Sequence, residues 1–355
     1  MADISHACDP SALRVTPLKR ALVAPDKFRG TASASDVAQS MSAVLVSAGY
    51  QVEIFPMSDG GEGLLEVFDG SLRSVLVTSA TGKRISASYK MHNNTAIIEM
   101  ATVAGLTLVG GASINDPMTA TTRGVGELIK AAIFAGAKRV IVGCGGSATT
   151  DGGLGAIEAL EPVVRLKGTE LVVACDVETL FCDAARDFAP QKGATPAQVA
   201  LLSLRMEALE RQYKSRFGVD VSSLKGGGAA GGLAGGLAAI GGRLVAGFEV
   251  VAEANGIYEA LEGASLIVTG EGYLDAQSYR GKVVGHVTSI ASDHSIPFLV
   301  IVGDYDQEVL AHRKDRSRVF SLVAQVGEKV ALDSTLESVK VVLKSALISN
   351  GLWSV

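Results

Sequence analysis

RVIVGCGGSATTDGG, residues 139–153, joins a short apolar run to a loop of glycines, hydroxyl side chains and one carboxylate, Asp151. The apolar run is rich in β-branched residues and ends at glycine, which predicts a buried strand. A polar, glycine-rich loop directly after such a strand has three interpretations: a tight structural turn, a cradle for a dinucleotide, or a site that handles phosphate. The rest of the chain has to distinguish them.

Apolar runs of the same kind recur along the chain and predict a parallel sheet. Each ends in glycine or in a polar turn, and they lie at residues 20–28, 52–63, 139–146, 265–272 and 297–304. Helical patterns follow most of them, at 33–49, 126–137, 307–313 and 336–349. This alternation is typical of an α/β fold, so we expect a Rossmann-like parallel sheet with helices on both faces.

Two regions depart from this alternation and predict a second domain. Residues 73–109 alternate apolar and polar side chains around Thr-Gly and Asn-Asn turns, which indicates antiparallel strands. Residues 196–216 are typical of a long charged helix, and the Gly/Ala tract at 226–242 of a close-packed helix or loop. We assign 20–66, 121–160 and 258–355 to the Rossmann-like domain, 67–120 and 161–257 to a second, smaller mixed α/β domain, and 1–19 to a flexible N-terminal extension.

Composition and charge exclude several classes of function. The net charge of the 355-residue chain is −5 with acids and bases interspersed, so no surface for nucleic acid is expected. No segment resembles a membrane span, and the four cysteines form no CxxC pair. We expect a cytoplasmic metabolic enzyme with reduced thiols and a small-molecule substrate, and the sequence leaves both monomer and homodimer open.

Chemically active side chains gather where the predicted strands end. One such loop is usually a turn with a solvated carboxylate, but ligands of an open parallel sheet bind outside the carboxyl ends of its strands, so several matching loops predict one site. Carboxylates beside glycines suit Mg²⁺ and its phosphate ligands, and lysines neutralise phosphate charge. Arg123, at the start of a predicted helix, is a candidate for binding a substrate carboxylate. The other candidates are Asp26, Lys27, Asp59, Glu62, Ser147, Thr149, Asp151, Asp176, Lys192, Glu271, Asp275, Gln277 and Lys282.

The dinucleotide interpretation has weak support. Residues 143–148 satisfy GxGxxA, but this match lies in the middle of a chain with 41 glycines. No acidic residue ends a second strand about 20 residues further on, where a ribose contact would be needed. The chain also lacks a GxxxxGK[ST] motif, and its histidines lie outside these loops.

At these loops the chain resembles the bacterial-type (type 1) glycerate kinase family. The matching stretches run in family order from about residue 21 to 304 and include APDKFRGTASASDVAQ, SDGGEG, NDPMTATTRGVGELI, GGSATTDGG, VACDV, PQKGAT, GGGAAGGL and TGEGYLDAQSYRGK. The resemblance implies phosphorylation of D-glycerate with ATP and Mg²⁺, in a cleft between two α/β domains, and we expect 2-phosphoglycerate rather than 3-phosphoglycerate.

This resemblance suggests a role for each candidate residue. Asp26, Asp176 and Asp275 are candidates for the base, and the last two of these for Mg²⁺. Lys27, Lys192 and Lys282 are expected to bind phosphate, and Arg123 the carboxylate of glycerate. The 143–151 loop is expected to hold either nucleotide phosphate or glycerate.

The chain also departs from the family pattern. Only EPVVRLKGTE, residues 161–170, lies where the family carries several dozen more residues. In addition, Ala189 stands where the family usually has glycine, Tyr273 where it has arginine, and Val284 where it has proline. These departures keep a second hypothesis open, a catalytically impaired homologue that binds or regulates. A third is a nicotinamide-dependent hydroxy-acid oxidoreductase, which rests on the GxGxxA match alone.

Overall fold

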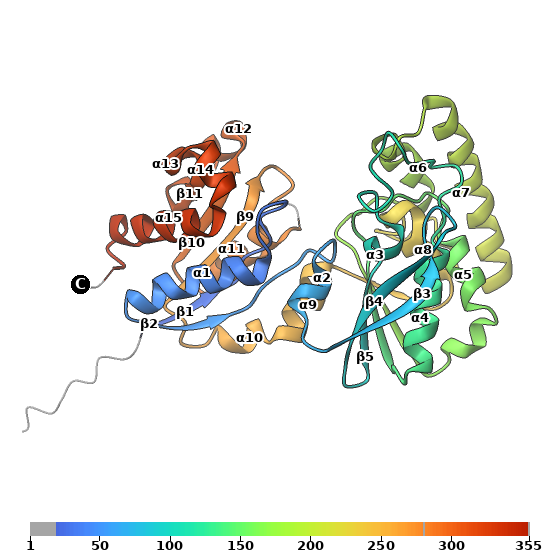
Figure 1. Cartoon of the computed structure of the whole chain (residues 1–355), viewed down its shortest axis with the longest axis horizontal. Coiled ribbons are helices and arrows are strands. Elements are labelled where there is room, and N and C mark those ends of the chain that lie inside the picture. Colours follow the sequence, from blue (N-terminus) through green and yellow to red (C-terminus); the bar gives the residue numbers. More distant parts are fainter. Residues whose placement is uncertain (1–18, 280, 354–355) are drawn as a thin grey trace, which may run out of the picture.

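The strands expected from the apolar runs form two separate sheets, and the two α/β domains built on them lie side by side (Figure 1). The computed structural model describes residues 19–279 and 281–353. The extension expected at 1–19 lies outside these residues except for Lys19, which begins the first strand. Within the described ranges, none of the helices has the length and apolar character that crossing a membrane requires.

The first domain contains an all-parallel sheet with the strand order β11-β10-β9-β1-β2. Alternate strand residues face opposite sides: Val268 packs in the core under α1 and α15, whereas Ile267 packs in the core toward α9 and α11. The Ser33 side chain caps α1 by accepting a hydrogen bond from the backbone N–H of Asp36. The elements are β1 (Lys19–Val23), α1 (Ala34–Ser47), β2 (Tyr50–Ile54), β9 (Leu266–Leu274), α11 (Val283–Asp293), β10 (Phe298–Tyr305), α12 (Gln307–Ala311), β11 (Val319–Ser321), α13 (Leu322–Val326), α14 (Glu328–Asp333) and α15 (Thr335–Ser349).

The second domain contains a six-stranded mixed sheet with the order β3-β4-β5-β6-β7-β8. β3, β4 and β5 are antiparallel, joined at the expected Thr-Gly and Asn-Asn turns, and the remaining strands are parallel. Its elements are β3 (Ser71–Thr78), β4 (Arg84–His92), β5 (Thr95–Glu99), α3 (Ala101–Ala104), α4 (Arg123–Phe134), β6 (Arg139–Gly143), α5 (Leu154–Leu160), β7 (Glu170–Ala174), α6 (Ala184–Phe188), α7 (Pro196–Phe217), α8 (Leu233–Ala239) and β8 (Arg243–Val245).

Three short helices lie where the domains meet: α2 (Leu64–Val67), α9 (Gly247–Asn255) and α10 (Ile257–Ala260) (Figure 1). One apolar core contains Ile267 of the first sheet, Ile141 of the second and Phe248 of α9 between them. Because this core is continuous across the junction, the carboxyl ends of strands from both sheets are held at a fixed position beside it. Single 3-10 turns complete the described chain: η1 (Val163–Leu166), η2 (Phe181–Asp183), η3 (Pro190–Lys192), η4 (Ala229–Gly232) and η5 (Arg316–Arg318).

The predicted fold class is confirmed, but one predicted domain segment is wrong. Residues 121–160 were expected in the Rossmann-like domain, whereas their strand β6 pairs with β5 and β7 of the second sheet. The second domain consequently carries the larger sheet and is not the smaller one expected. The physical reason is that an apolar, β-branched run shows that a strand is buried on both faces and says nothing about which strands flank it.

Two other expectations from sequence are confirmed. α7 is the long charged helix expected at 196–216, and Thr195 caps it in a capping box with Gln198. The Gly/Ala tract at 226–242 forms η4 and α8, and every residue of α8 is buried. This helix packs closely because it lacks large side chains: a Cβ atom on Gly236 would lie 2.4 Å from the carbonyl oxygen of Gly152.

Candidate active site

Strands of both sheets end at one cavity between the domains, which we call the acidic cavity. It has a volume of about 290 Å³. Asp26 follows β1, Asp59 follows β2, and Glu271 lies on β9, while Gly145 and Gly146 come from the loop after β6. The predicted site residues that line it are Asp26, Lys27, Asp59, Glu62, Glu271, Asp275 and Lys282, and Arg29 and Tyr273 line it too.

The glycines of the 143–146 segment allow the two domains to touch at this cavity. A Cβ atom on Gly145 would lie 2.3 Å from the Cα atom of Gly61, and one on Gly143 would lie 2.5 Å from the carbonyl oxygen of Gly60. Larger side chains would therefore push the loop after β2 away from the loop after β6. This contact accounts for the GxG spacing without a dinucleotide, and the oxidoreductase hypothesis loses the motif on which it rested.

Burial and mutual repulsion raise the pKa values of three carboxyl groups at this site. Burial, with the nearby Asp59 carboxylate, raises the pKa of Asp26 to about 6 and that of Asp176 to about 8. Burial raises the pKa of Glu271 to about 7, although a hydrogen bond from Ser278 acts in the opposite direction. Carboxyl groups in a cleft whose pKa values lie near neutral pH are typical of sites for proton transfer or cation binding.

Two carboxylate oxygens at the site are buried without a hydrogen-bond partner, Oδ2 of Asp176 and Oε1 of Glu271. The other Asp176 oxygen, Oδ1, accepts from the backbone N–H of Gly247 at 2.8 Å, which fixes the carboxylate orientation. Among the described residues, no three His, Cys, Asp or Glu side chains are close enough to hold a metal by themselves. Mg²⁺ fits this arrangement, because it is usually held by one or two carboxylates together with waters and substrate phosphates.

A second cavity, which we call the lysine cavity, adjoins the acidic cavity and shares Arg29, Glu62, Gly145 and Gly146 with it. Its volume is about 470 Å³. Lys192 lines it and donates hydrogen bonds to the carbonyl oxygen of Thr149 at 2.7 Å and to Oγ of Ser147 at 3.3 Å. The predicted residues Ser147, Thr149 and Lys192 are thus brought together, with Thr149 buried behind the other two.

A third cavity, of about 640 Å³, lies beside Asp176 at the ends of β7 and β8. Its walls combine apolar side chains such as Leu244 with Lys225 and His286, and the His286 ring stacks on Phe248 at a centroid distance of 4.5 Å. Sequence analysis placed Asp176 with the other acids but did not reveal this neighbouring space.

Asp151 lines none of the three cavities, and its carboxylate binds backbone and side-chain groups of the second domain. It is 9% exposed, and Oδ2 accepts from the backbone N–H and Oγ1 of Thr122 at 2.8 and 2.9 Å. Oδ1 accepts from the backbone N–H of Gly153 at 3.1 Å. This carboxylate ties the start of α4 to the loop before α5, and its predicted contact with substrate stays a prediction.

We expect Asp151→Ala to lower the free energy of unfolding by about 2–4 kcal/mol, because it leaves the buried donors of Thr122 and Gly153 without acceptors. Asp151→Asn, which keeps one acceptor oxygen, should cost less. Urea denaturation of both variants measures the difference. A stable Asp151→Ala protein with impaired turnover would instead assign this side chain to the reaction.

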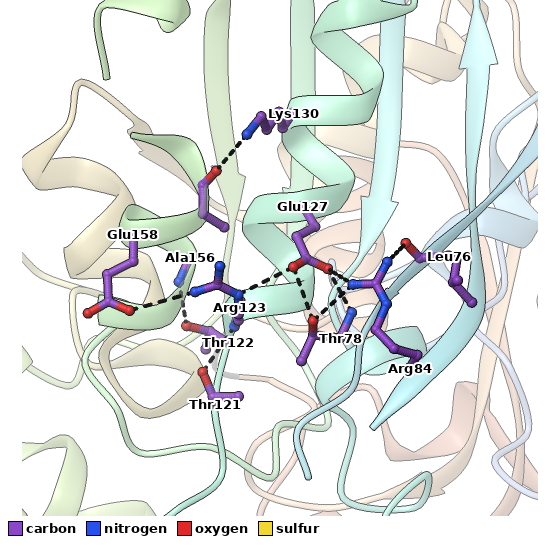
Figure 2. A network of polar contacts seen from close by, with 11 residues as sticks. Leu76, Thr78, Arg84, Thr121, Thr122, Arg123, Glu127, Lys130, Ala156 and Glu158 are labelled. Carbon is purple, nitrogen blue, oxygen red and sulfur yellow. Dashed lines mark hydrogen bonds and ion pairs between the residues drawn. The ribbon is translucent and has the colours of Figure 1, made fainter. Parts of the chain in front are cut away.

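Arg123 lies in an ion-pair network and lines none of the three cavities, so its predicted contact with a substrate carboxylate stays a prediction. Figure 2 shows its guanidinium between two helix carboxylates: Nε lies 3.4 Å from Glu127, and Nη1 lies 3.9 Å from Glu158. Glu127 also accepts hydrogen bonds from Thr78 and Arg84, which joins α4 to the β3–β4 hairpin (Figure 2). An arginine at a helix start has the same sequence signature in either role, and only its partners distinguish them.

Gln277 and Asp275 belong to one turn after β9. Oδ1 of Asp275 accepts from the backbone N–H groups of Gln277 and Ser278 at 2.7 and 3.1 Å. Gln277 itself is exposed and does not line the acidic cavity. Of these two residues, Asp275 lines the cavity.

Arg29 also lines the cavity, and sequence analysis did not include it among the candidates although it stands two residues after Lys27.

Comparison with known proteins identifies the family. The model of the glycerate kinase family matches residues 21–164 and 161–348. The chain is 35% identical to the glycerate 2-kinase of Escherichia coli (strain K12), over 86% of this chain and 91% of that protein. It is 33% identical to the glycerate kinase of Bacillus subtilis (strain 168), over 85% and 90% of the two chains. The chain belongs to the glycerate kinase family.

A solved structure supports the same fold for this family member. It comes from Salmonella typhimurium LT2, is provisionally named glycerate kinase 2, and superposes with a TM-score of 0.80 at 31% identity. The superposition covers 94% of this chain and 98% of that one. The protein is therefore an enzyme of the glycerate kinase family with its two-domain α/β fold, as the resemblance implied.

Residues 161–170, the segment expected to be shorter than in the glycerate kinase family, lead into the start of β7. The family match divides at residues 161–164, within the stretch where the chain is shorter than expected. That stretch ends at Glu170, the first residue of β7, whereas Asp176 lies two residues after Ala174, the last residue of the same strand. The two ends of a strand lie on opposite edges of the sheet, so residues 161–170 meet β7 at the edge opposite to Asp176.

The single-residue departures also fit the structure. Ala189 has helical φ and ψ angles, −67° and −33°, that need no glycine. Val284 occupies the first turn of α11, where a proline is favourable but not required. Tyr273 is 56% exposed at the acidic cavity, which Arg29 also lines.

Proposed function

We propose that this enzyme transfers the γ-phosphoryl group of ATP to D-glycerate with the help of Mg²⁺, and that the product is 2-phosphoglycerate. The observation that carries the proposal is the acidic cavity, where clustered carboxylates meet Lys27 and Lys282 at the carboxyl ends of strands from both domains. The choice of the 2-hydroxyl group is supported by the relative named glycerate 2-kinase. The three described free cysteines support a cytoplasmic location.

The step to be catalysed is an in-line displacement at phosphorus. The glycerate hydroxyl oxygen forms a bond to the γ-phosphorus atom, the bond from that atom to the β,γ-bridging oxygen breaks, and ADP leaves with the electron pair. The hydroxyl proton passes to a carboxylate, for which we assign Asp26. Its Oδ1 atom accepts from the backbone N–H of Lys27 at 2.7 Å, which holds the carboxyl group in place, and a pKa of about 6 suits a base that works near neutral pH.

The lysines and the other carboxylates of the site would bind the phosphates and Mg²⁺. Lys27 and Lys282 line the same cavity and would neutralise the charge on the transferring phosphoryl group. Asp176 and its close neighbour Asp59 would hold Mg²⁺, since the Oδ2 atom of Asp176 is buried without a partner and the two carboxylates repel each other. When bound, this ion adds charge neutralisation at the phosphate oxygens.

Phosphorus NMR of the purified protein with ATP, Mg²⁺ and D-glycerate tests the proposal. We expect ADP and a phosphomonoester signal that matches 2-phosphoglycerate. A signal of 3-phosphoglycerate would correct the regiochemistry alone. If no phosphoglycerate forms while the Escherichia coli relative is active in the same buffer, the proposed activity is wrong and the hypothesis of an impaired homologue takes its place.

A further inference from the structure

We propose that the lysine cavity is the acceptor subsite and that Lys192 holds the carboxylate of glycerate there, rather than a phosphate of ATP. This inference rests on the proposed kinase activity and assigns the two substrates to separate parts of the cleft. The inference also assigns the loop after β6 to glycerate, since Ser147 of that loop accepts a hydrogen bond from the Lys192 ammonium group.

Lys192 is a buried cation that lacks a counter-ion. Its side chain is 3% exposed, and both of its hydrogen bonds go to neutral oxygens, Oγ of Ser147 and the carbonyl oxygen of Thr149. Among the described residues, no carboxylate lies within ion-pair distance of its Nζ atom, although the third N–H group still needs an acceptor. Burial of an unpaired charge is costly, so a cation at a cavity wall favours an anionic ligand.

The charges of the two adjoining cavities select different ligands. The acidic cavity is lined by five acidic residues and three basic ones, so a bound anion there needs an accompanying cation. The acidic residues are Asp26, Asp59, Glu62, Glu271 and Asp275, and the basic ones are Lys27, Arg29 and Lys282. Among the described residues that line the lysine cavity, Glu62 is the only acidic one, and its side chain lies 3.9 Å from Arg29 in an ion pair. Phosphates with Mg²⁺ therefore fit the first cavity, and an organic carboxylate fits the second.

The shared wall would bring the two substrates into contact. Gly145, Gly146, Arg29 and Glu62 border both cavities, so an acceptor whose carboxylate lies on Lys192 directs its hydroxyl group toward the phosphates. The other walls of the lysine cavity carry apolar side chains, Leu106, Val177, Phe188, Ala229 and Ala230, with Thr107 and Gln191 as neutral polar ones. The apolar side chains lower the local dielectric constant, which strengthens the attraction of a carboxylate to the ammonium group.

The protonation of Lys192 follows from the same surroundings. Burial lowers the pKa of Lys192 to about 7, and Asp151 behind the loop acts weakly in the opposite direction. Across the cavity the charged groups are Arg29 and Glu62, which pair with each other. The charged form is the one that binds a carboxylate, so KM for glycerate should rise about tenfold per pH unit above about pH 7 as the amine loses its proton.

Lys192→Met tests the assignment. We expect kcat/KM for D-glycerate to fall at least about 100-fold, mainly through KM, while the dissociation constant of MgADP changes less than about threefold. Lys282→Met, which changes the lysine of the acidic cavity, should show the reverse: weaker MgADP binding and a nearly unchanged KM for glycerate. Removal of a buried unpaired charge should leave the Met variant folded, and circular dichroism checks this.

Neutral acceptors provide a second measurement, whose first part uses the wild-type enzyme alone. The wild-type enzyme should prefer D-glycerate over glycerol and glyceramide by about 100-fold or more, and Lys192→Met should narrow that preference by at least about tenfold. A Met variant that binds MgADP weakly and keeps its KM for glycerate would overturn the inference. So would a wild-type KM that is flat from pH 6 to 9. Absence of phosphoglycerate in the NMR experiment would instead contradict the proposed function itself.

Discussion

Asp26→Asn should lower kcat for glycerate phosphorylation by about 10²–10⁴-fold, because an amide cannot accept the hydroxyl proton. The substitution keeps the oxygen that accepts from the Lys27 backbone N–H, so the loop after β1 should stay in place. In the wild-type enzyme, Asp26 must lose its proton to act, so kcat/KM should rise with pH through about 6, the pKa of this carboxyl group. Stopped assays of ADP release between pH 5 and 8 measure both effects.

Asp293→Asn is the matched control for this variant. Asp293 is an exposed carboxylate at the end of α11, and its substitution changes the net charge by the same amount. Its kcat and pH profile should match those of the wild type. If Asp26→Asn keeps more than about a tenth of the wild-type kcat, or keeps the rise in rate near pH 6, the base is another group and Glu271 becomes the next candidate.

Asp176→Asn should remove most of the response to Mg²⁺. Because folding raises the pKa of this carboxyl group to about 8, the folded state binds more protons than the unfolded state between about pH 4 and 8, and its stability should fall as the pH rises through this range. Mg²⁺ should restore stability at pH 8 in the wild type by occupying the site of the missing proton. In the Asn variant, the loss of stability with pH and the gain from Mg²⁺ should both decrease.

Urea denaturation at pH 5 and 8, with and without 10 mM MgCl₂ and no nucleotide, measures these effects independently of turnover. Asp176→Asn preserves an acceptor for the Gly247 N–H, so the turn before α9 should hold. Asp293→Asn again serves as the charge-matched control. An Asn variant that gains as much stability from Mg²⁺ as the wild type at pH 8 would exclude Asp176 as a ligand.

Much of the local structure could be predicted from the sequence. β-branched runs ending in glycine predicted β1, β2, β6, β9 and β10, and alternation around the turn at Asn93 predicted the β4–β5 pair. Such patterns report burial and periodicity, which neighbouring residues along the chain determine by themselves. The same reasoning placed β6 in the wrong sheet, because strand neighbours are chosen by long-range packing.

The candidate site, too, could be predicted from the sequence in part only. The acids and lysines at the ends of β1, β2 and β9 were expected together, and the structure brings Asp26, Asp59 and Glu271 to one cavity. Asp151 and Arg123 have equally suggestive positions in the sequence, yet their carboxylate and guanidinium groups bind other parts of the second domain. No local pattern distinguishes a polar side chain that faces a cavity from one that joins two elements.

The loop in RVIVGCGGSATTDGG illustrates what each level decides. The sequence by itself determined that a buried strand leads into a flexible polar loop at the carboxyl edge of a sheet, since period, β-branching and glycine are local properties. Only the tertiary structure decided that Gly143 and Gly145 admit the loop of the other domain, that Ser147 faces the Lys192 ammonium group, and that Asp151 turns inward. These roles depend on which groups the fold brings within a few ångströms from distant parts of the chain.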